Sequence, residues 1–106
     1  MIEALTPEEY LRLSAAGELW QLLDVREPWE IEIASLDKTV NIPMGEIPSR
    51  HTELDRARPV AVLCHSGGRS ARVAAYLAQQ GYSRVANIEG GIDAWSQDID
   101  ASIPRY

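Results

Sequence analysis

Apolar residues gather in four short runs that are typical of buried β-strands. The clearest is Val60-Ala61-Val62-Leu63, which is rich in β-branched residues and holds no charge. Unbroken apolar runs of this length indicate strands that are covered on both faces, as in parallel sheets. The other three predicted strands are residues 20–25, 40–42 and 85–88.

Helices are predicted between these strands. Thr6, Pro7 and Glu9 have the type and spacing of an N-cap, a first helical residue and the closing residue of a capping box, and the segment ends at Gly17. Residues 70–80 form a second clear helix, because their apolar residues recur on one side. Shorter helices are predicted over residues 28–34 and 92–97 and within a turn-rich segment, residues 44–54.

Strands that alternate with helices predict a parallel sheet whose crossover helices cover both faces. The expected fold class is therefore α/β, a small doubly wound domain. No internal repeat, low-complexity tract or linker divides the sequence, so we expect a single domain over residues 1–106.

A single cysteine among 106 residues limits the chemistry of the chain. It excludes an intramolecular disulfide framework, a multi-cysteine zinc site and a Cys-x-x-Cys redox pair, and it fits a reducing compartment. The first residues do not have the basic and apolar regions of a signal peptide, and no apolar run approaches the roughly 18–20 residues of a membrane span. We therefore expect a cytoplasmic protein that binds no membrane.

The net charge of −6 argues against a broad basic face for nucleic acid. The charge is unevenly distributed, because residues 56–84 hold five bases and no acid. The only cysteine, Cys64, lies inside this positive stretch. The composition therefore directs attention to one local site.

The segment Cys64-His65-Ser66-Gly67-Gly68-Arg69-Ser70 joins the clearest strand to the clearest helix, which is where ligands bind in open parallel sheets. Its glycines allow successive backbone N–H groups to turn inward, and the helix start adds a positive dipole end. These groups and the nearby arginines favour a thiolate and lower the pKa of Cys64. We predict that Cys64 is a nucleophile in an anion-binding loop rather than a small buried hydrophobe.

Several residues near the cysteine have two interpretations. Arg69 at a helix start predicts an anionic ligand, because a cation is unfavourable there without one. Arg72 is either a substrate anchor or a surface residue, and His65 either polarises a substrate or is a solvated loop histidine. Ser70 is most simply an N-cap, with a hydroxyl that can also face the pocket.

Other polar and aromatic residues are interpreted as structural. Asp24 and Arg26 end the first predicted strand near the loop, where an ion pair or a turn hydrogen bond with Glu27 or Glu30 is favoured over substrate contact. His51 is interpreted as a surface histidine, and the three tryptophans are interpreted as packing residues: Trp20, Trp29 and Trp95.

Five motifs occur in the order and spacing of a known family. They are residues 24–30, Asn41-Ile42-Pro43, the loop of residues 64–70, Gly81-Tyr82 and Gly90-Gly91-Ile92-Asp93-Ala94-Trp95. With these motifs the chain resembles the single-domain rhodanese-like sulfurtransferases over a core of roughly residues 5–96, which leaves residues 97–106 as a tail.

The resemblance implies a five-stranded, mostly parallel sheet flanked by helices. It also implies that Cys64 is the catalytic residue, which accepts a sulfane sulfur as a persulfide and passes it to a thiophilic acceptor. Residues 35–39 depart from the family, since relatives usually have a glycine here and Asp37-Lys38 must make the turn at a conformational cost. The substrate-binding loop implied by the resemblance consists of His65, Ser66, Gly67, Gly68, Arg69 and Ser70.

The expected partners are a small anionic sulfur donor such as thiosulfate, and a thiol, cyanide or a protein as sulfur acceptor. No metal or organic cofactor is needed for this chemistry. One alternative is a persulfide carrier or interaction module that serves a partner protein with little turnover of small molecules. A phosphatase or arsenate reductase is disfavoured, because those enzymes place five residues between cysteine and arginine and only four separate Cys64 from Arg69.

Overall fold

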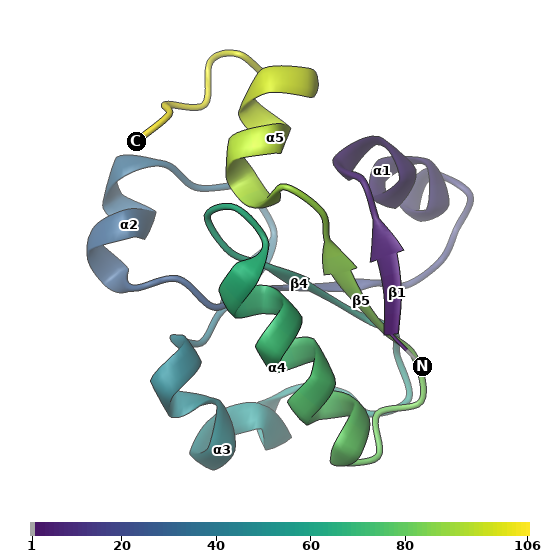
Figure 1. Cartoon of the computed structure of the whole chain (residues 1–106). Coiled ribbons are helices and arrows are strands. Elements are labelled where there is room, and N and C mark those ends of the chain that lie inside the picture. The colour runs from purple at the N-terminus through teal and green to yellow at the C-terminus, as the bar shows by residue number, and fades with distance from the viewer. Residues whose placement is uncertain (1) are drawn as a thin grey trace.

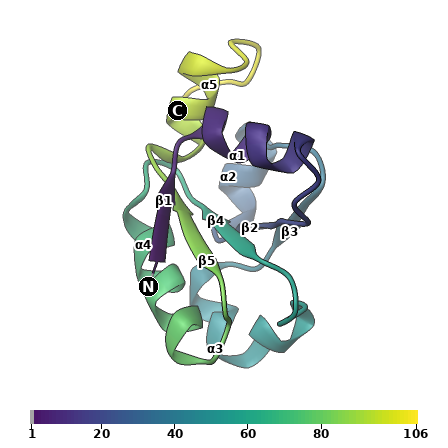
Figure 2. The ribbon, with the colours of Figure 1, turned by 90° about the vertical axis from the view of Figure 1, so that its right-hand side faces the viewer.

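The computed structural model describes residues 2–106. A five-stranded sheet, entirely parallel, lies at the centre of the molecule in the order β1-β5-β4-β2-β3 (Figures 1 and 2). All four strands predicted from the apolar pattern are present, and the α/β fold is confirmed. The strands are β1 (Ile2–Leu5), β2 (Gln21–Asp24), β3 (Thr39–Asn41), β4 (Val60–Leu63) and β5 (Val85–Ile88).

Helices cover both faces of the sheet (Figures 1 and 2). Helices α1 and α5 pack on one face, and α3 and α4 pack on the other. None of the helices within residues 2–106 has the length and apolar character that crossing a membrane requires. The helices are α1 (Pro7–Ala15), α2 (Pro28–Ile33), α3 (Ile47–Arg50), α4 (Gly68–Gln79) and α5 (Gly91–Asp98), with 3-10 turns at Met44–Glu46 and His51–Glu53.

The side-chain alternation of the strands divides the core into two layers. In β4, Val60 and Val62 belong to the layer under α3 and α4, whereas Ala61 and Leu63 belong to the layer under α1 and α5. All four residues of β4 are buried. Because both faces are covered, this strand is apolar at every position, which is why it is the clearest strand in the sequence.

Strand β1 is the element that the apolar pattern did not predict. Its four residues, Ile2-Glu3-Ala4-Leu5, include a charge, and only Leu5 is fully buried. The strand pairs with β5 alone, at the edge of the sheet. An edge strand of this length is specified by its partner strand, which lies more than 80 residues away in the sequence.

The two clear helices begin differently. The predicted capping box is present at α1, where the Thr6 and Glu9 side chains each accept a hydrogen bond from the other residue's backbone N–H. Helix α4 starts two residues earlier than predicted, because Gly67 is its N-cap with a left-handed φ of +112°. The prediction that Ser70 is the N-cap is therefore wrong, and its hydroxyl instead donates to the Gly67 carbonyl at 3.1 Å.

One structural interpretation is wrong, and another holds only in part. His51 is only 7% exposed, and its Nδ1 lies 3.2 Å from the Tyr82 hydroxyl, a partner that satisfies the buried ring nitrogen. Trp20 and Trp95 are buried as predicted, whereas Trp29 is 58% exposed and packs edge-to-face on the Tyr106 ring rather than in the core.

The segment that departs from the family pattern forms a tight turn before β3. Lys38 adopts a φ of +59°, the left-handed conformation that glycine would adopt at lower cost. The conformational cost expected from the sequence is therefore present at Lys38.

Candidate active site

The cysteine loop lies at the carboxyl edge of β4, the central strand of the sheet. The first residues of α5 hold this loop from the other side. The Ile92 N–H donates to the Cys64 carbonyl at 2.9 Å, and the Asp93 N–H donates to the His65 carbonyl at 3.0 Å. Gly91 permits this approach, because a Cβ there would lie 2.4 Å from the Cys64 carbonyl oxygen. Two segments of the sequence, residues 64–70 and 90–95, therefore build one site.

The Cys64 sulfur is surrounded by hydrogen-bond donors. The Gly67 N–H donates to Sγ at 3.1 Å, and the Ser70 hydroxyl lies 3.2 Å from the same atom. Burial would by itself raise the pKa of Cys64. Hydrogen bonds from the Ser70 hydroxyl and from the backbone of Ser70, Gly67 and Ser66 outweigh it, so that the pKa of Cys64 lies below its ordinary value of 9.0. The loop thus favours the thiolate.

Asn87 lies behind the loop and was not singled out in the sequence. Its side chain on β5 contacts the Ser70 hydroxyl, with 2.5 Å between Asn87 Oδ1 and Ser70 Oγ, and its Nδ2 donates to the Gly67 carbonyl at 3.4 Å. A serine hydroxyl has one proton, so donation to the thiolate competes with donation to Asn87 or Gly67. Asn87 therefore holds the Ser70 oxygen beside the sulfur and competes with the thiolate for the hydroxyl proton.

A cavity of about 330 Å³ opens beside the thiol. Cys64 is 1% exposed, which places the sulfur at the bottom of this cavity rather than on the protein surface. The cavity brings together most of the residues predicted for the site, and it adds Arg72. Its lining consists of Cys64, His65, Ser66, Gly68, Arg69 and Arg72.

Arg69 is held in an ion pair across the mouth of the loop. Its Nη1 and Nη2 donate to the two Glu30 carboxylate oxygens at 2.6 and 2.8 Å. The hydrogen bonds from Arg69 are the main reason that the pKa of Glu30 falls to about 2. Glu30 is therefore ionised at neutral pH. Its carboxylate balances the positive charge of Arg69, for which the sequence predicted an anionic ligand.

The tail docks against the loop instead of leaving the domain. The Tyr106 ring stacks on the His65 ring, with centroids 4.1 Å apart and planes 10° from parallel. The Tyr106 hydroxyl donates to Glu30 Oε2 at 2.7 Å and accepts from Arg26 Nη1 at 3.0 Å. His65 is thus covered on one face and is not a freely solvated loop histidine.

Asp24 and Arg26 form an ion pair with each other, whereas the sequence favoured Glu27 or Glu30 as the partner. Their side chains are fully buried, and Arg26 Nη2 lies 2.8 Å from Asp24 Oδ2. Arg26 also donates to the carbonyls of Glu30 and Ala34 at 3.4 and 2.8 Å. These contacts hold the segment that carries Glu30, so the buried pair helps to position the Glu30 carboxylate that binds Arg69.

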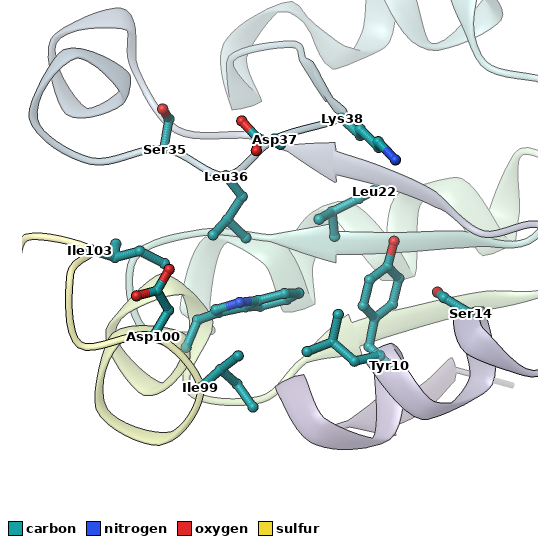
Figure 3. Close-up of a pocket in the computed structure, with 12 residues that line it drawn as sticks. Tyr10, Ser14, Leu22, Ser35, Leu36, Asp37, Lys38, Ile99, Asp100 and Ile103 are labelled. Atoms are coloured by element: carbon teal, nitrogen blue, oxygen red, sulfur yellow. The ribbon is translucent and has the colours of Figure 1, made fainter.

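A second, larger cavity of about 480 Å³ lies away from the thiol, between α1, α5 and the turn at residues 35–38 (Figure 3). Leu22 and Leu36 face Tyr10 and Ile99 across it, and these side chains make that part of the lining apolar. No residue of the 64–70 loop lines this cavity. Within residues 2–106 no group of three or more His, Cys, Asp and Glu side chains could hold a metal ion.

Comparisons with known proteins agree with this architecture. Residues 6–98 match the family described as Rhodanese-like domain. The chain belongs to the rhodanese-like family. A solved structure, the rhodanese-related protein of Thermoplasma volcanium, superposes with a TM-score of 0.83 at 31% identity, covering 92% of this chain and 93% of that one.

Two curated relatives differ in length. The protein named "Sulfurtransferase" from Allochromatium vinosum is 39% identical over 97 residues, which cover 92% of this chain and 91% of the relative. The "Rhodanese-like/PpiC domain-containing protein 12, chloroplastic" of Arabidopsis thaliana is 47% identical over 90 residues, 81% of this chain. The chain spans only 30% of that second relative's length.

Proposed function

We propose that the chain is a sulfurtransferase in which Cys64 carries sulfane sulfur as a persulfide. The name of the Allochromatium relative supports sulfur transfer in general. The observation that carries the finer proposal is the Cys64 sulfur, which lies at the bottom of a cavity and accepts hydrogen bonds from the loop. The same donors that stabilise a thiolate also stabilise the persulfide anion that replaces it.

The first half-reaction transfers sulfur from an anionic donor such as thiosulfate. The Cys64 thiolate attacks the outer sulfur, a bond forms between the two sulfur atoms, and the bond from that outer sulfur to the sulfite group breaks. Sulfite leaves with the electron pair, and Cys64 becomes a persulfide anion. The loop residues proposed to surround the donor are His65, Ser66, Gly67, Gly68, Arg69 and Ser70.

The second half-reaction regenerates the thiolate. An external nucleophile, which is cyanide, a thiol or a protein thiol, attacks the terminal sulfur and removes it, giving a two-step covalent cycle. An external acceptor is required because Cys64 is the only cysteine of the sequence. The proposed domain consists of residues 1–106, and its tail stacks Tyr106 on His65 of the loop.

The test is a steady-state assay of thiocyanate formation from thiosulfate and cyanide. The wild-type chain is expected to turn over, with rate depending on both substrates in a ping-pong pattern. Cys64→Ser is expected to be inactive while retaining the fold. Turnover that persists in Cys64→Ser would overturn the proposal.

A further inference from the structure

The two arginines that line the thiol cavity differ in electrostatic state. Arg69 donates twice to Glu30, whose carboxylate balances its charge. Arg72, on the second turn of α4, is exposed and forms no ion pair or side-chain hydrogen bond within residues 2–106. The uncompensated positive charge in this cavity is therefore that of Arg72.

Arg72 also borders a second hollow. A shallow groove of about 170 Å³ runs from Arg72 over the surface between α4 and the segment of residues 44–48. We call its other lining residues the apolar ledge: Met44, Ile47, Pro48, Val73 and Tyr76. Arg72 thus stands between the thiol cavity and the apolar ledge.

The apolar ledge is firmly supported. Ile47 and Val73 are buried, and Met44 and Tyr76 are half-buried against the same core layer that contains Cys64. The apolar ledge carries no charged side chain, and Arg72 is the one charged residue that lines the groove. Arg72 lies between the Cys64 thiol and an apolar surface. This arrangement fits a ligand that has a sulfane sulfur for the thiol, an anionic group for Arg72 and an organic group for the apolar surface.

We propose that Arg72 anchors the anionic group of the sulfur donor and that the apolar ledge takes an organic group of that donor. The preferred donor class is then an organic thiosulfonate, R–SO₂–S⁻, rather than inorganic thiosulfate. This inference rests on the proposed function of Cys64. Arg69 remains part of the cavity wall, and its ion pair with Glu30 holds the loop.

The chemistry of this donor balances in the same way as that of thiosulfate. The Cys64 thiolate forms a bond to the terminal sulfur, and the sulfur–sulfur bond of the donor breaks. The electron pair leaves with the organic sulfinate, R–SO₂⁻. Cys64 holds the persulfide anion, and no external oxidant or reductant takes part.

The test compares benzenethiosulfonate with thiosulfate as donors, with cyanide as the acceptor. The wild-type chain should have the higher kcat/KM with benzenethiosulfonate. Arg72→Ala should raise the KM of both donors about tenfold, the size of one charge-assisted contact, with a smaller effect on kcat. The KM of Arg72→Lys should lie between those of the wild type and Arg72→Ala. Added salt should raise KM in the wild type more than in Arg72→Ala.

Two further variants complete the design. Arg12→Ala removes an exposed arginine of α1, outside the site, and should behave as the wild type. Met44→Gln makes the apolar ledge polar at similar length and should lower the preference for benzenethiosulfonate over thiosulfate about fivefold. Circular dichroism should show that every variant is folded.

The outcomes separate the inference from the function on which it rests. If the wild type forms no persulfide with either donor, the proposed function fails and the inference fails with it. If persulfide forms and Arg72→Ala matches Arg12→Ala, only the role of Arg72 is overturned. If thiosulfate is preferred and Met44→Gln does not change the preference, the apolar ledge serves another molecule, such as an acceptor protein, and its role in donor binding is overturned.

Discussion

Gly91, the first residue of α5, should tolerate no side chain. Its φ is +59°, and a Cβ there would lie 2.4 Å from the Cys64 carbonyl oxygen and 2.5 Å from that of His65. Both neighbours are backbone atoms, so Gly91→Ala must displace either α5 or the loop that carries the thiol. This substitution therefore tests whether the close contact of the two segments builds the site.

The expected cost follows from three terms. An alanine in the left-handed conformation costs roughly 1–2 kcal/mol. Separating α5 from the loop weakens the hydrogen bonds from the Ile92 and Asp93 N–H groups, each worth about 1 kcal/mol. Gly91→Ala should therefore lower the free energy of unfolding by about 3 kcal/mol, a large part of the 5–15 kcal/mol that is typical of a domain.

Urea unfolding followed by tryptophan fluorescence measures this loss. Gly17→Ala is the matched control, because Gly17 has a φ of +98° but no atom within 4 Å of an added Cβ. The control should lose only the conformational term and should form persulfide at the wild-type rate. Gly91→Ala should form it about a hundredfold more slowly, because a displacement of about 1 Å misplaces the nucleophile. Equal stability losses, or an unchanged rate in Gly91→Ala, would refute the reasoning.

Three other predictions concern separate features of the structure. Ser70→Ala should raise the pKa of Cys64, because a hydrogen bond to Sγ is lost, and the pH profile of alkylation should move to higher pH; an unmoved profile would contradict this. Glu30 has a pKa lowered from 4.5 to about 2, so its carboxylate adds about 3 kcal/mol of stability above pH 4.5 that is lost as the pH falls towards 2. Glu30→Gln should therefore be less stable than the wild type at pH 7, and a difference that does not shrink in acid would exclude this origin. Lys38→Gly should raise the free energy of unfolding by about 0.5–1 kcal/mol by relieving the left-handed strain, whereas Asp37→Gly should lower it. Thermal unfolding distinguishes these two, and equal shifts would contradict the assignment.

The place of the candidate site in the fold could be predicted because its sequence signals are local. The apolar run of β4, the glycines after it and the helical pattern of α4 are contiguous in the sequence, and together they place Cys64 at a strand-to-helix junction. The two adjacent glycines at residues 90–91 are recognisable in the sequence as part of a family motif. Their purpose, which is to let α5 approach the Cys64 carbonyl, appears only when the two segments are brought together.

The contacts that could not be predicted join residues distant in the sequence. Glu30 and Arg69 are 39 residues apart, and Tyr106 lies 76 residues from Glu30. Nothing in the local pattern around these residues indicates which partner each one meets. The same limit applies to Asn87, whose partner Ser70 is also distant in the sequence. The signal that the sequence offers is a polar residue within a mostly buried strand.

The sulfur that Cys64 is proposed to hold can be observed directly. Intact-protein mass spectrometry after treatment with thiosulfate or benzenethiosulfonate, and then with cyanide, tests the central claim. We predict that the wild-type chain gains one sulfur atom, that cyanide removes it, and that Cys64→Ser gains none. A wild-type chain that gains no sulfur from either donor, or a gain that persists in Cys64→Ser, would contradict the account.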